Sequence, residues 1–97
     1  MASQWYLYVL RCADDTLYTG ITTDLSRRVH EHNHTPRGAK YTASRRPVEL
    51  VGAWEQAGRS QAASAEWHFK KLTRQQKLAR VEEVSEAVLR AYLSDAR

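Results

Sequence analysis

The sequence has very little of what cross-linked, zinc-bound or membrane-spanning proteins require. Cys12 is the only cysteine among 97 residues, which excludes an internal disulfide framework and a cysteine-based zinc finger. No apolar run approaches the roughly 20 residues that a helix needs to cross a bilayer. The first five residues contain no positive segment followed by a long apolar one. We therefore expect a reducing, cytoplasmic compartment and no membrane partner.

The chain also lacks the signs of several domains. It has no internal repeat, low-complexity tract or Gly/Ser linker. With 97 residues and 42% hydrophobic content, it can build one compact core and not two. We expect a main domain over residues 1–80, with residues 81–97 forming a C-terminal helix packed on the same domain.

Three segments rich in aromatic and branched residues predict strands. Residues 5–12 are apolar on both alternating faces, which is typical of a strand covered on two sides, so we expect this strand at the centre. Residues 17–21 read as the returning strand of a hairpin, and residues 48–55 as a third strand. A three-residue loop at 13–15 would pair Tyr8 with Gly20 and would place Tyr8 and Tyr18 on one face of the sheet.

Helical periodicity accounts for most of the remaining chain. Asp24 and the two threonines before it are N-cap candidates for a helix that runs to about His32. A second helix is predicted around residues 62–72, and the capping-box pattern of Thr73 with Gln76 starts a third. Residues 33–46 have turn formers and cations without periodicity, so we expect an exposed loop there. The order β-β-α-β-α-α predicts an α/β fold with a small three-stranded, mainly antiparallel sheet flanked by helices.

Several polar residues of these elements are suited to chemistry on phosphate. Arg28 and His32 are four residues apart, so a helix places them on one side, facing the two tyrosines. The forked guanidinium of Arg28 suits the oxyanion of a phosphoryl transition state. Glu66 lies on a predicted helix between two apolar positions, where a buried carboxylate needs a partner, and a hard divalent cation is such a partner.

The positive charge is concentrated near the predicted loop. The formal net charge is +4, and residues 27–46 contain six arginines and lysines against a single acidic residue, Glu31. A phosphate backbone is attracted to such a segment. The side chains that we expect to contact nucleic acid are Arg37, Lys40, Arg45 and Arg46. Tyr41 either stacks on an unpaired base or covers the base of the loop.

The ordered set of these motifs resembles the GIY-YIG nuclease superfamily, especially its small stand-alone bacterial branch. The matching residues span Trp5 to about Lys77, and they are Tyr8, Tyr18-Thr19-Gly20, Asp24-Leu25, Arg28, His32-Asn33, Gly38 to Thr42, Arg46-Pro47, and Glu66 ahead of Lys70 to Thr73. The first motif has Tyr6-Leu7 where the family has Gly-Ile, and the second has Thr19 in its middle position.

The resemblance implies a three-stranded antiparallel sheet and a divalent-metal-dependent nuclease that hydrolyses phosphodiester bonds. Its cofactor would be Mg²⁺ or Mn²⁺ on Glu66. Tyr8 would be the base that activates water, Tyr18 would orient phosphate or water, and His32 would assist proton transfer. DNA is the expected substrate ahead of RNA, with low sequence specificity and a role in DNA repair or processing. Gly20 would leave room beside Tyr8 for a phosphate or a water.

Each of these residues also has a structural interpretation. Strand tyrosines usually pack, an isolated Arg28 would pair with Asp24, and an isolated Glu66 would be solvated. The string His30, His32 and His34 is not expected to bind a metal, because positions i and i+2 diverge on a helix. The residues that we expect in the core are Cys12, Trp5, Trp54, Trp67 and Phe69.

Two other functions compete with the nuclease. The first is a non-catalytic nucleic-acid-binding module with the same fold. The second is a protein-interaction or dimer surface made by residues 81–97, although an amphipathic stripe more often closes its own core. We expect a monomer or a weak dimer.

Overall fold

The computed structural model describes residues 4–84. The C-terminal helix expected at residues 81–97, and the interaction surface considered for it, therefore lie almost entirely outside the described residues. The elements are β1 (Trp5–Arg11), β2 (Leu17–Thr22), α1 (Leu25–His34), α2 (Lys40–Ala43), β3 (Glu49–Gln56), α3 (Arg59–Lys70) and α4 (Arg74–Glu82).

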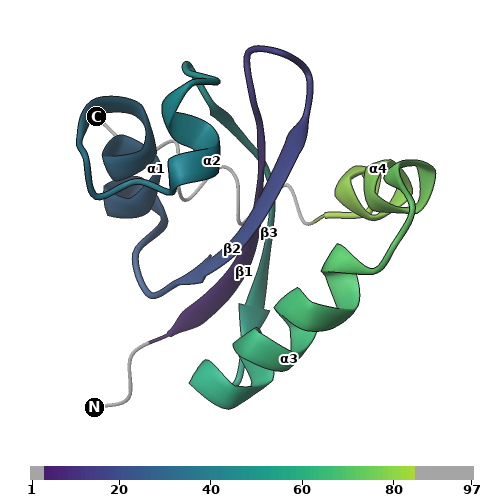
Figure 1. Cartoon of the computed structure of the whole chain (residues 1–97). Helices are drawn as coiled ribbons and strands as arrows, with labels where there is room; N and C mark the ends of the chain where they lie inside the picture. The colour runs from purple at the N-terminus through teal and green to yellow at the C-terminus, as the bar shows by residue number, and fades with distance from the viewer. Residues whose placement is uncertain (1–3, 85–97) are drawn as a thin grey trace.

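The sheet is antiparallel throughout, with the strand order β2-β1-β3. Helices α1 and α2 cover one face of this sheet, and α3 and α4 lie on the other side (Figure 1). The predicted α/β fold, with a three-stranded sheet flanked by helices and residues 5–12 in the central strand, is confirmed. The element order differs from the prediction only in the additional short helix α2.

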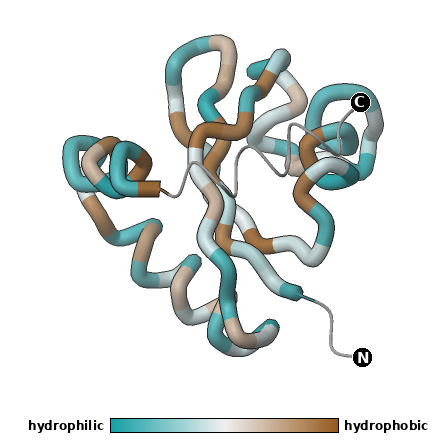
Figure 2. Tube along the Cα trace, turned by 180° about the vertical axis from the view of Figure 1, so that it is seen from behind, coloured by the Kyte–Doolittle hydropathy of each residue, from teal (hydrophilic) through white to brown (hydrophobic). Residues whose placement is uncertain are grey.

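Strand β1 is buried on both faces because its side chains alternate between two hydrophobic clusters. Leu7 and Val9 pack with Phe69 of α3, whereas Tyr8 and Leu10 pack on the opposite face with residues of α1 such as Leu25. Figure 2 shows hydrophobic stretches in the strands between the helices and hydrophilic residues on the outer turns. Burying one such aliphatic side chain contributes about 1.5–3 kcal/mol to folding, so β1 anchors both layers.

The β1–β2 hairpin has the predicted register. Tyr8 pairs with Gly20, and Leu10 pairs with Tyr18. The backbone N–H of Cys12 donates to the carbonyl of Thr16 at 2.8 Å, which closes a three-residue loop. Its last residue, Asp15, has a φ of 68°, the left-handed conformation that such loops require and that Asp tolerates better than most residues. Both tyrosines consequently lie on the α1 side of the sheet.

Helix α1 begins where the sequence predicts. The carboxylate of Asp24 accepts a hydrogen bond from the backbone N–H of Arg27 at 3.0 Å, which satisfies one of the free donors of the first turn. Leu25, Val29 and His32 form the buried face of the helix. Spacings of three and four residues place these three side chains against the sheet.

The prediction of an exposed loop at residues 33–46 is wrong in part: most of these residues are exposed, but the segment is not without regular structure. The segment contains α2, and its Thr42 is completely buried. The side-chain amide of Asn33 holds the backbone of Val48 on both sides, donating to its carbonyl at 3.0 Å and accepting from its N–H at 2.7 Å. Helix α2 is only four residues long, too short to show a periodicity in the sequence.

The expected core position of Trp67 is also wrong. Its side chain is 56% exposed, and the ammonium of Lys71 lies 3.7 Å from the centroid of its ring. Ala62 and Phe69 are the buried residues of α3. Since Trp67 is two positions before Phe69, a helix of 3.6 residues per turn places it about 200° away, on the solvent side. Cys12, by contrast, is buried as predicted.

Helix α4 begins with the predicted capping box. The Thr73 hydroxyl accepts from the backbone N–H of Gln76 at 3.2 Å, and the Gln76 side chain accepts from the backbone N–H of Thr73 at 2.9 Å. This reciprocal pair satisfies two donors at the helix terminus.

We expect Thr73→Ala to lower the free energy of unfolding by about 1 kcal/mol, the usual effect of losing an N-cap hydroxyl. Urea denaturation of wild type and variant would measure the difference. Gln75→Ala, in the same turn and exposed, is the matched control and should change stability by less than about 0.5 kcal/mol. Equal effects of the two substitutions would contradict the capping role.

Candidate active site

Four polar side chains meet on the α1 side of the sheet. Tyr8 comes from β1, Tyr18 from β2, and Arg28 and His32 from α1. The ring centroids of Tyr8 and Tyr18 are 6.4 Å apart, those of Tyr8 and His32 are 5.9 Å apart, and those of Tyr18 and His32 are 5.2 Å apart. The structure therefore brings together these four residues of the predicted site.

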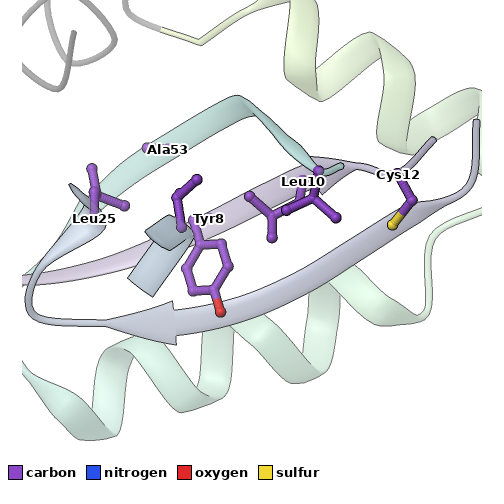
Figure 3. Close-up of a cluster of buried hydrophobic side chains, with 7 residues drawn as sticks. Tyr8, Leu10, Cys12, Leu25 and Ala53 are labelled. Carbon is purple, nitrogen blue, oxygen red and sulfur yellow. The ribbon is translucent and has the colours of Figure 1, made fainter. Parts of the chain in front are cut away.

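Gly20 determines where the Tyr8 phenol can lie. A Cβ atom at Gly20 would be 2.5 Å from the Tyr8 hydroxyl oxygen and 2.7 Å from the ring carbon that carries it. In Figure 3 the Tyr8 ring extends from its own strand toward the neighbouring one, with its hydroxyl at the tip. The room beside Tyr8 that we expected for a phosphate or a water is thus filled by the phenol of Tyr8 itself.

The Tyr8 hydroxyl is the centre of the hydrogen-bond network. Its oxygen lies 2.8 Å from His32 Nε2, and it accepts a hydrogen bond from Arg28 Nε at 3.4 Å. Burial raises the pKa of Tyr8 to about 12. The hydrogen bond and the charge of Arg28 lower this pKa, and the charges of Tyr18 and Glu66 raise it. The phenol therefore holds its proton at neutral pH.

Arg28 is held in place from three directions. Besides its contact with Tyr8, its Nη1 donates to the Glu31 carboxylate at 3.1 Å and to the backbone carbonyl of Arg37 at 2.8 Å. Burial lowers the pKa of Arg28, but the hydrogen bonds and the charges of Tyr8 and Glu31 together outweigh burial, and the pKa is raised. The acidic partner of Arg28 is thus Glu31, whereas Asp24 caps the helix. A fixed guanidinium of this kind is preorganised to stabilise negative charge.

His32 is completely buried, and both of its ring nitrogens have partners. Nε2 faces Tyr8, and Nδ1 lies 2.8 Å from the hydroxyl oxygen of Thr42. Burial lowers the pKa of His32 to about 4, the positive charges of Arg28 and Arg46 act in the same direction, and Glu31 opposes them. The imidazole is therefore neutral at pH 7.

Glu66 comes from α3, on the other side of the sheet from α1 (Figure 1). Its carboxylate is 25% exposed and lies 3.2 Å from the ammonium of Lys70. The charge of Glu66 raises the pKa of Tyr8. This effect is smaller than the effects of burial and of the Arg28 hydrogen bond. The negative charge of Glu66 thus opposes ionisation of the Tyr8 phenol from the opposite layer.

The aromatic residue of α2 lies beside the site. Tyr41 is 39% exposed, and its ring stacks on that of Tyr18 with a centroid distance of 5.9 Å and an angle of 28°. The guanidinium carbon of Arg45 lies 4.0 Å from the Tyr41 ring centroid, and its Nε donates to the Asp14 carboxylate at 3.0 Å. Tyr41 consequently covers part of the site while keeping an exposed surface.

The other predicted nucleic-acid contacts fall into two groups. Arg46 donates to the backbone carbonyls of His32 and Thr35, both at 2.6 Å, so its guanidinium links the end of α1 to the segment before β3. The side chains of Arg37 and Lys40 are exposed and form no hydrogen bond or ion pair within residues 4–84. Those two cations are available to a phosphate backbone.

Within residues 4–84, no three His, Cys, Asp or Glu side chains lie together so that they could hold a metal ion. The rings of His30 and His34 contact each other on the outside of α1, with centroids 4.9 Å apart, whereas His32 points inward. His68 is exposed on α3, as expected.

A separate hollow of about 410 Å³ lies on the opposite side of the sheet, lined by residues of β3, α3 and α4 such as Trp54, Phe69 and Arg80. It contains none of the predicted site residues. In the described part of the chain, no helix combines the length and hydropathy that crossing a membrane requires.

Sequence reasoning missed two members of the network, Thr42 and Glu31. Thr42 entered only as the last residue of the motif Gly38 to Thr42, and Glu31 only as the single acid among the cations. The contact of Thr42 with His32 depends on how the end of α1 packs against α2, whereas Glu31 pairs with Arg28 three residues before it on α1, a spacing that helical periodicity could have indicated. No pattern in the local sequence predicts the packing of α1 against α2.

The low pKa of His32 makes folding sensitive to acid. The unfolded chain binds this proton near pH 6.5 and the folded chain only near pH 4, so the stability from the neutral imidazole is complete above pH 6.5 and is lost as the pH falls toward 4. We expect this group to lower the free energy of unfolding by roughly 3 kcal/mol across that interval. Urea denaturation at the two pH values would measure it. His68→Gln should keep the loss, and an equal loss in His32→Gln would contradict this origin.

Comparison with known proteins identifies the family. The model of the GIY-YIG catalytic domain matches residues 4–79. UPF0213 proteins of Desulfotalea psychrophila and Cupriavidus necator are each 48% identical to this chain, over 81 and 77 residues. These alignments cover 81% and 79% of this chain, and 74% and 83% of the relatives.

Two solution NMR structures have a similar fold. The UPF0213 protein from Bacillus halodurans is 39% identical with a TM-score of 0.53, and the match covers 81% of this chain and 83% of that one. A protein from E. faecalis is 46% identical with a TM-score of 0.58, covering 82% and 84%.

GIY-YIG domains are nuclease domains that bind nucleic acid and generally use divalent metal ions, so the match supports a nuclease-type function. The sequence motifs, the three-stranded sheet and the similarity to these relatives all indicate the same family. The chain therefore belongs to the GIY-YIG family, among its small bacterial UPF0213 proteins.

Proposed function

We propose that this protein is a divalent-metal-dependent nuclease that hydrolyses phosphodiester bonds of DNA. The site residues are Tyr8, Tyr18, Arg28, His32 and Glu66. The observation that carries the proposal is the Tyr8 hydroxyl, which is shared between His32 Nε2 at 2.8 Å and Arg28 Nε at 3.4 Å. A proton donor, a proton acceptor and a fixed positive charge thus meet at one oxygen.

The Glu66 carboxylate suits a hard divalent ion. It is partly exposed, and its ion pair with Lys70 is between residues four apart on the surface of α3, so losing that ion pair costs little. Mg²⁺ and Mn²⁺ take oxygen ligands, and Mg²⁺ needs only one or two carboxylates because water and substrate oxygens complete its shell. When bound, the ion would supply Lewis-acid stabilisation of the negative charge on the phosphate.

The proton path follows from the raised pKa of Tyr8. Because the phenol keeps its proton below a pH of about 12, it activates water by relay and not as a phenolate. The water gives a proton to the Tyr8 oxygen while the Tyr8 proton passes to His32 Nε2. The resulting hydroxide bonds to phosphorus, the bond from phosphorus to the leaving oxygen breaks, and that oxygen takes a proton from solvent. The relay then runs in reverse through Tyr8 and returns the extra proton of His32 to solvent.

Arg28 and Tyr18 handle the phosphate. The guanidinium of Arg28 is fixed by Glu31 and by a backbone carbonyl, so it stabilises the charge that develops on the non-bridging oxygens without reorganising. Tyr18, half-buried between His32 and Tyr41, orients the phosphate or the water.

Substrate binding relies on charge. Arg37 and Lys40 are exposed cations whose side chains have no ion-pair or hydrogen-bond partner within residues 4–84, and contacts of such cations read the phosphate backbone and not the sequence. Within residues 4–84, no three His, Cys, Asp or Glu side chains lie together as a zinc module for base readout would require. We therefore propose low sequence specificity and a role in repair or processing of DNA.

A binding module without catalysis is the second candidate. It is favoured by one observation: the Tyr8 side chain is only 1% exposed, which limits the approach of water. Cleavage of plasmid and of nicked, flapped, branched and single-stranded oligonucleotides with Mg²⁺ or Mn²⁺ decides between the two. Salt-dependent binding without cleavage under any of these conditions would establish the module.

We expect Glu66→Gln to lower metal-dependent cleavage by about 100-fold or more, because it removes the charged oxygen ligand. Its thermal unfolding should match that of the wild type, since the Glu66 side chain is partly exposed and its ion pair with Lys70 contributes little. The measurement is the single-turnover rate at saturating Mg²⁺, with EDTA as the blank. Glu82→Gln, an exposed acid on α4, is the matched control. Wild-type cleavage by Glu66→Gln would remove Glu66 from the metal site.

The two tyrosines should respond differently to loss of their hydroxyls. Tyr8→Phe removes the atom bonded to both His32 and Arg28, so we expect the single-turnover rate to fall by about 100-fold to 10,000-fold. Tyr18→Phe should have a smaller effect that is mainly on KM. Normal cleavage by Tyr8→Phe together with loss of cleavage by Tyr18→Phe would exchange the two roles.

A further inference from the structure

Thr42 is a buried polar residue that the proposed reaction does not use. It is the only buried residue of α2 and has no exposed surface. Its hydroxyl oxygen lies 2.8 Å from His32 Nδ1 and 2.9 Å from the backbone carbonyl oxygen of Ala39. Because the hydroxyl carries only one hydrogen, these two contacts cannot both use it as a donor.

The carbonyl of Ala39 can only accept, so the Thr42 hydroxyl donates to it. Toward His32, the same oxygen must then accept, and the hydrogen of that contact belongs to Nδ1. A neutral imidazole carries one N–H. Nε2 is therefore without a hydrogen, and the 2.8 Å contact between Nε2 and Tyr8 is a hydrogen bond donated by the Tyr8 hydroxyl.

The opposite tautomer satisfies the buried groups less well. With the hydrogen on Nε2, the Tyr8 oxygen would accept from both His32 and Arg28. The hydrogen of the buried Tyr8 hydroxyl would then have no acceptor in this network, at a cost of about 1–3 kcal/mol. With the hydrogen on Nδ1, this nitrogen cannot accept the hydrogen bond from the backbone N–H of Ala39. That contact is longer, at 3.3 Å, and Ala39 is only partly buried.

We propose that Thr42 is a positioning residue that sets the tautomer of His32, with the hydrogen on Nδ1, so that Nε2 is a proton acceptor for Tyr8. The catalytic consequence rests on the proposed nuclease function. In the relay, Nε2 must be free to take the Tyr8 proton as Tyr8 takes one from water. The imidazolium that forms keeps its Nδ1 hydrogen bond to Thr42, so this contact is present before and after the transfer.

The tautomer can be observed without any activity. Long-range ¹H–¹⁵N correlation spectra of the whole chain at neutral pH distinguish a protonated Nδ1 from a protonated Nε2. We expect wild-type His32 to show a protonated Nδ1 and an unprotonated Nε2. Thr42→Ser, which keeps the hydroxyl, should give the same pattern, and Thr42→Val, which keeps the shape, should shift His32 toward a protonated Nε2. A protonated Nε2 in the wild type would overturn the proposal even if the Val variant does not fold.

Cleavage kinetics test the consequence. Thr42→Val should lower the single-turnover rate by roughly 10-fold to 100-fold, the effect typical of losing the partner that orients a functional histidine. KM should stay within about twofold, and Thr42→Ser should restore the rate. A Val variant with the wild-type tautomer and rate would refute the positioning role. If the wild type cleaves no substrate but shows the Thr42-dependent tautomer, the nuclease proposal fails while the assignment of the tautomer to Thr42 is supported.

Discussion

The hydrogen bond between the Tyr8 hydroxyl and His32 Nε2 joins the central strand to the first helix, and the rest of the site is arranged around it. Both partners are buried, so each side chain must find its polar partner inside the protein. Arg28, one turn before His32 on the same helix, donates to the same hydroxyl. A single oxygen thus aligns α1 against the sheet and collects the polar groups of the site at one place.

The surrounding structure provides the space and the contacts that this bond requires. Gly20, opposite Tyr8 on the edge strand, has no side chain to displace the phenol. On the other side, the guanidinium of Arg46 holds the carbonyl of His32, and the amide of Asn33 holds the backbone of Val48. These contacts close the chain between α1 and β3 and bring Thr42 against the imidazole. Among the cations near the site, Arg46 therefore stabilises the fold, whereas the side chains of Arg37 and Lys40 face solvent.

Local patterns predicted the strands, the hairpin register and the N-termini of α1 and α4, because each depends on neighbours a few residues away. The alternation of β1 and the spacing of Tyr8 and Tyr18 were sufficient to place both phenols on one face. The position of Arg28 and His32 followed from the helical period. The short helix α2, the buried Thr42 and the exposed Trp67 were not predicted. A single turn has no period to detect, and the solvent-facing side of α3 is decided by which of its residues meet the sheet.

The sequence by itself determined the three strands, the helices α1, α3 and α4, the register of the hairpin and the family. These depend on periodicity, capping residues and turn chemistry, which act over short stretches of chain. Only the tertiary structure decided the contact of Arg28 with Tyr8, the backbone carbonyls that Arg46 holds, and the contact of Thr42 with His32. The physical reason is that a buried polar group takes whichever partner the packed elements place within about 3 Å, and such partners come from segments that are distant in the sequence.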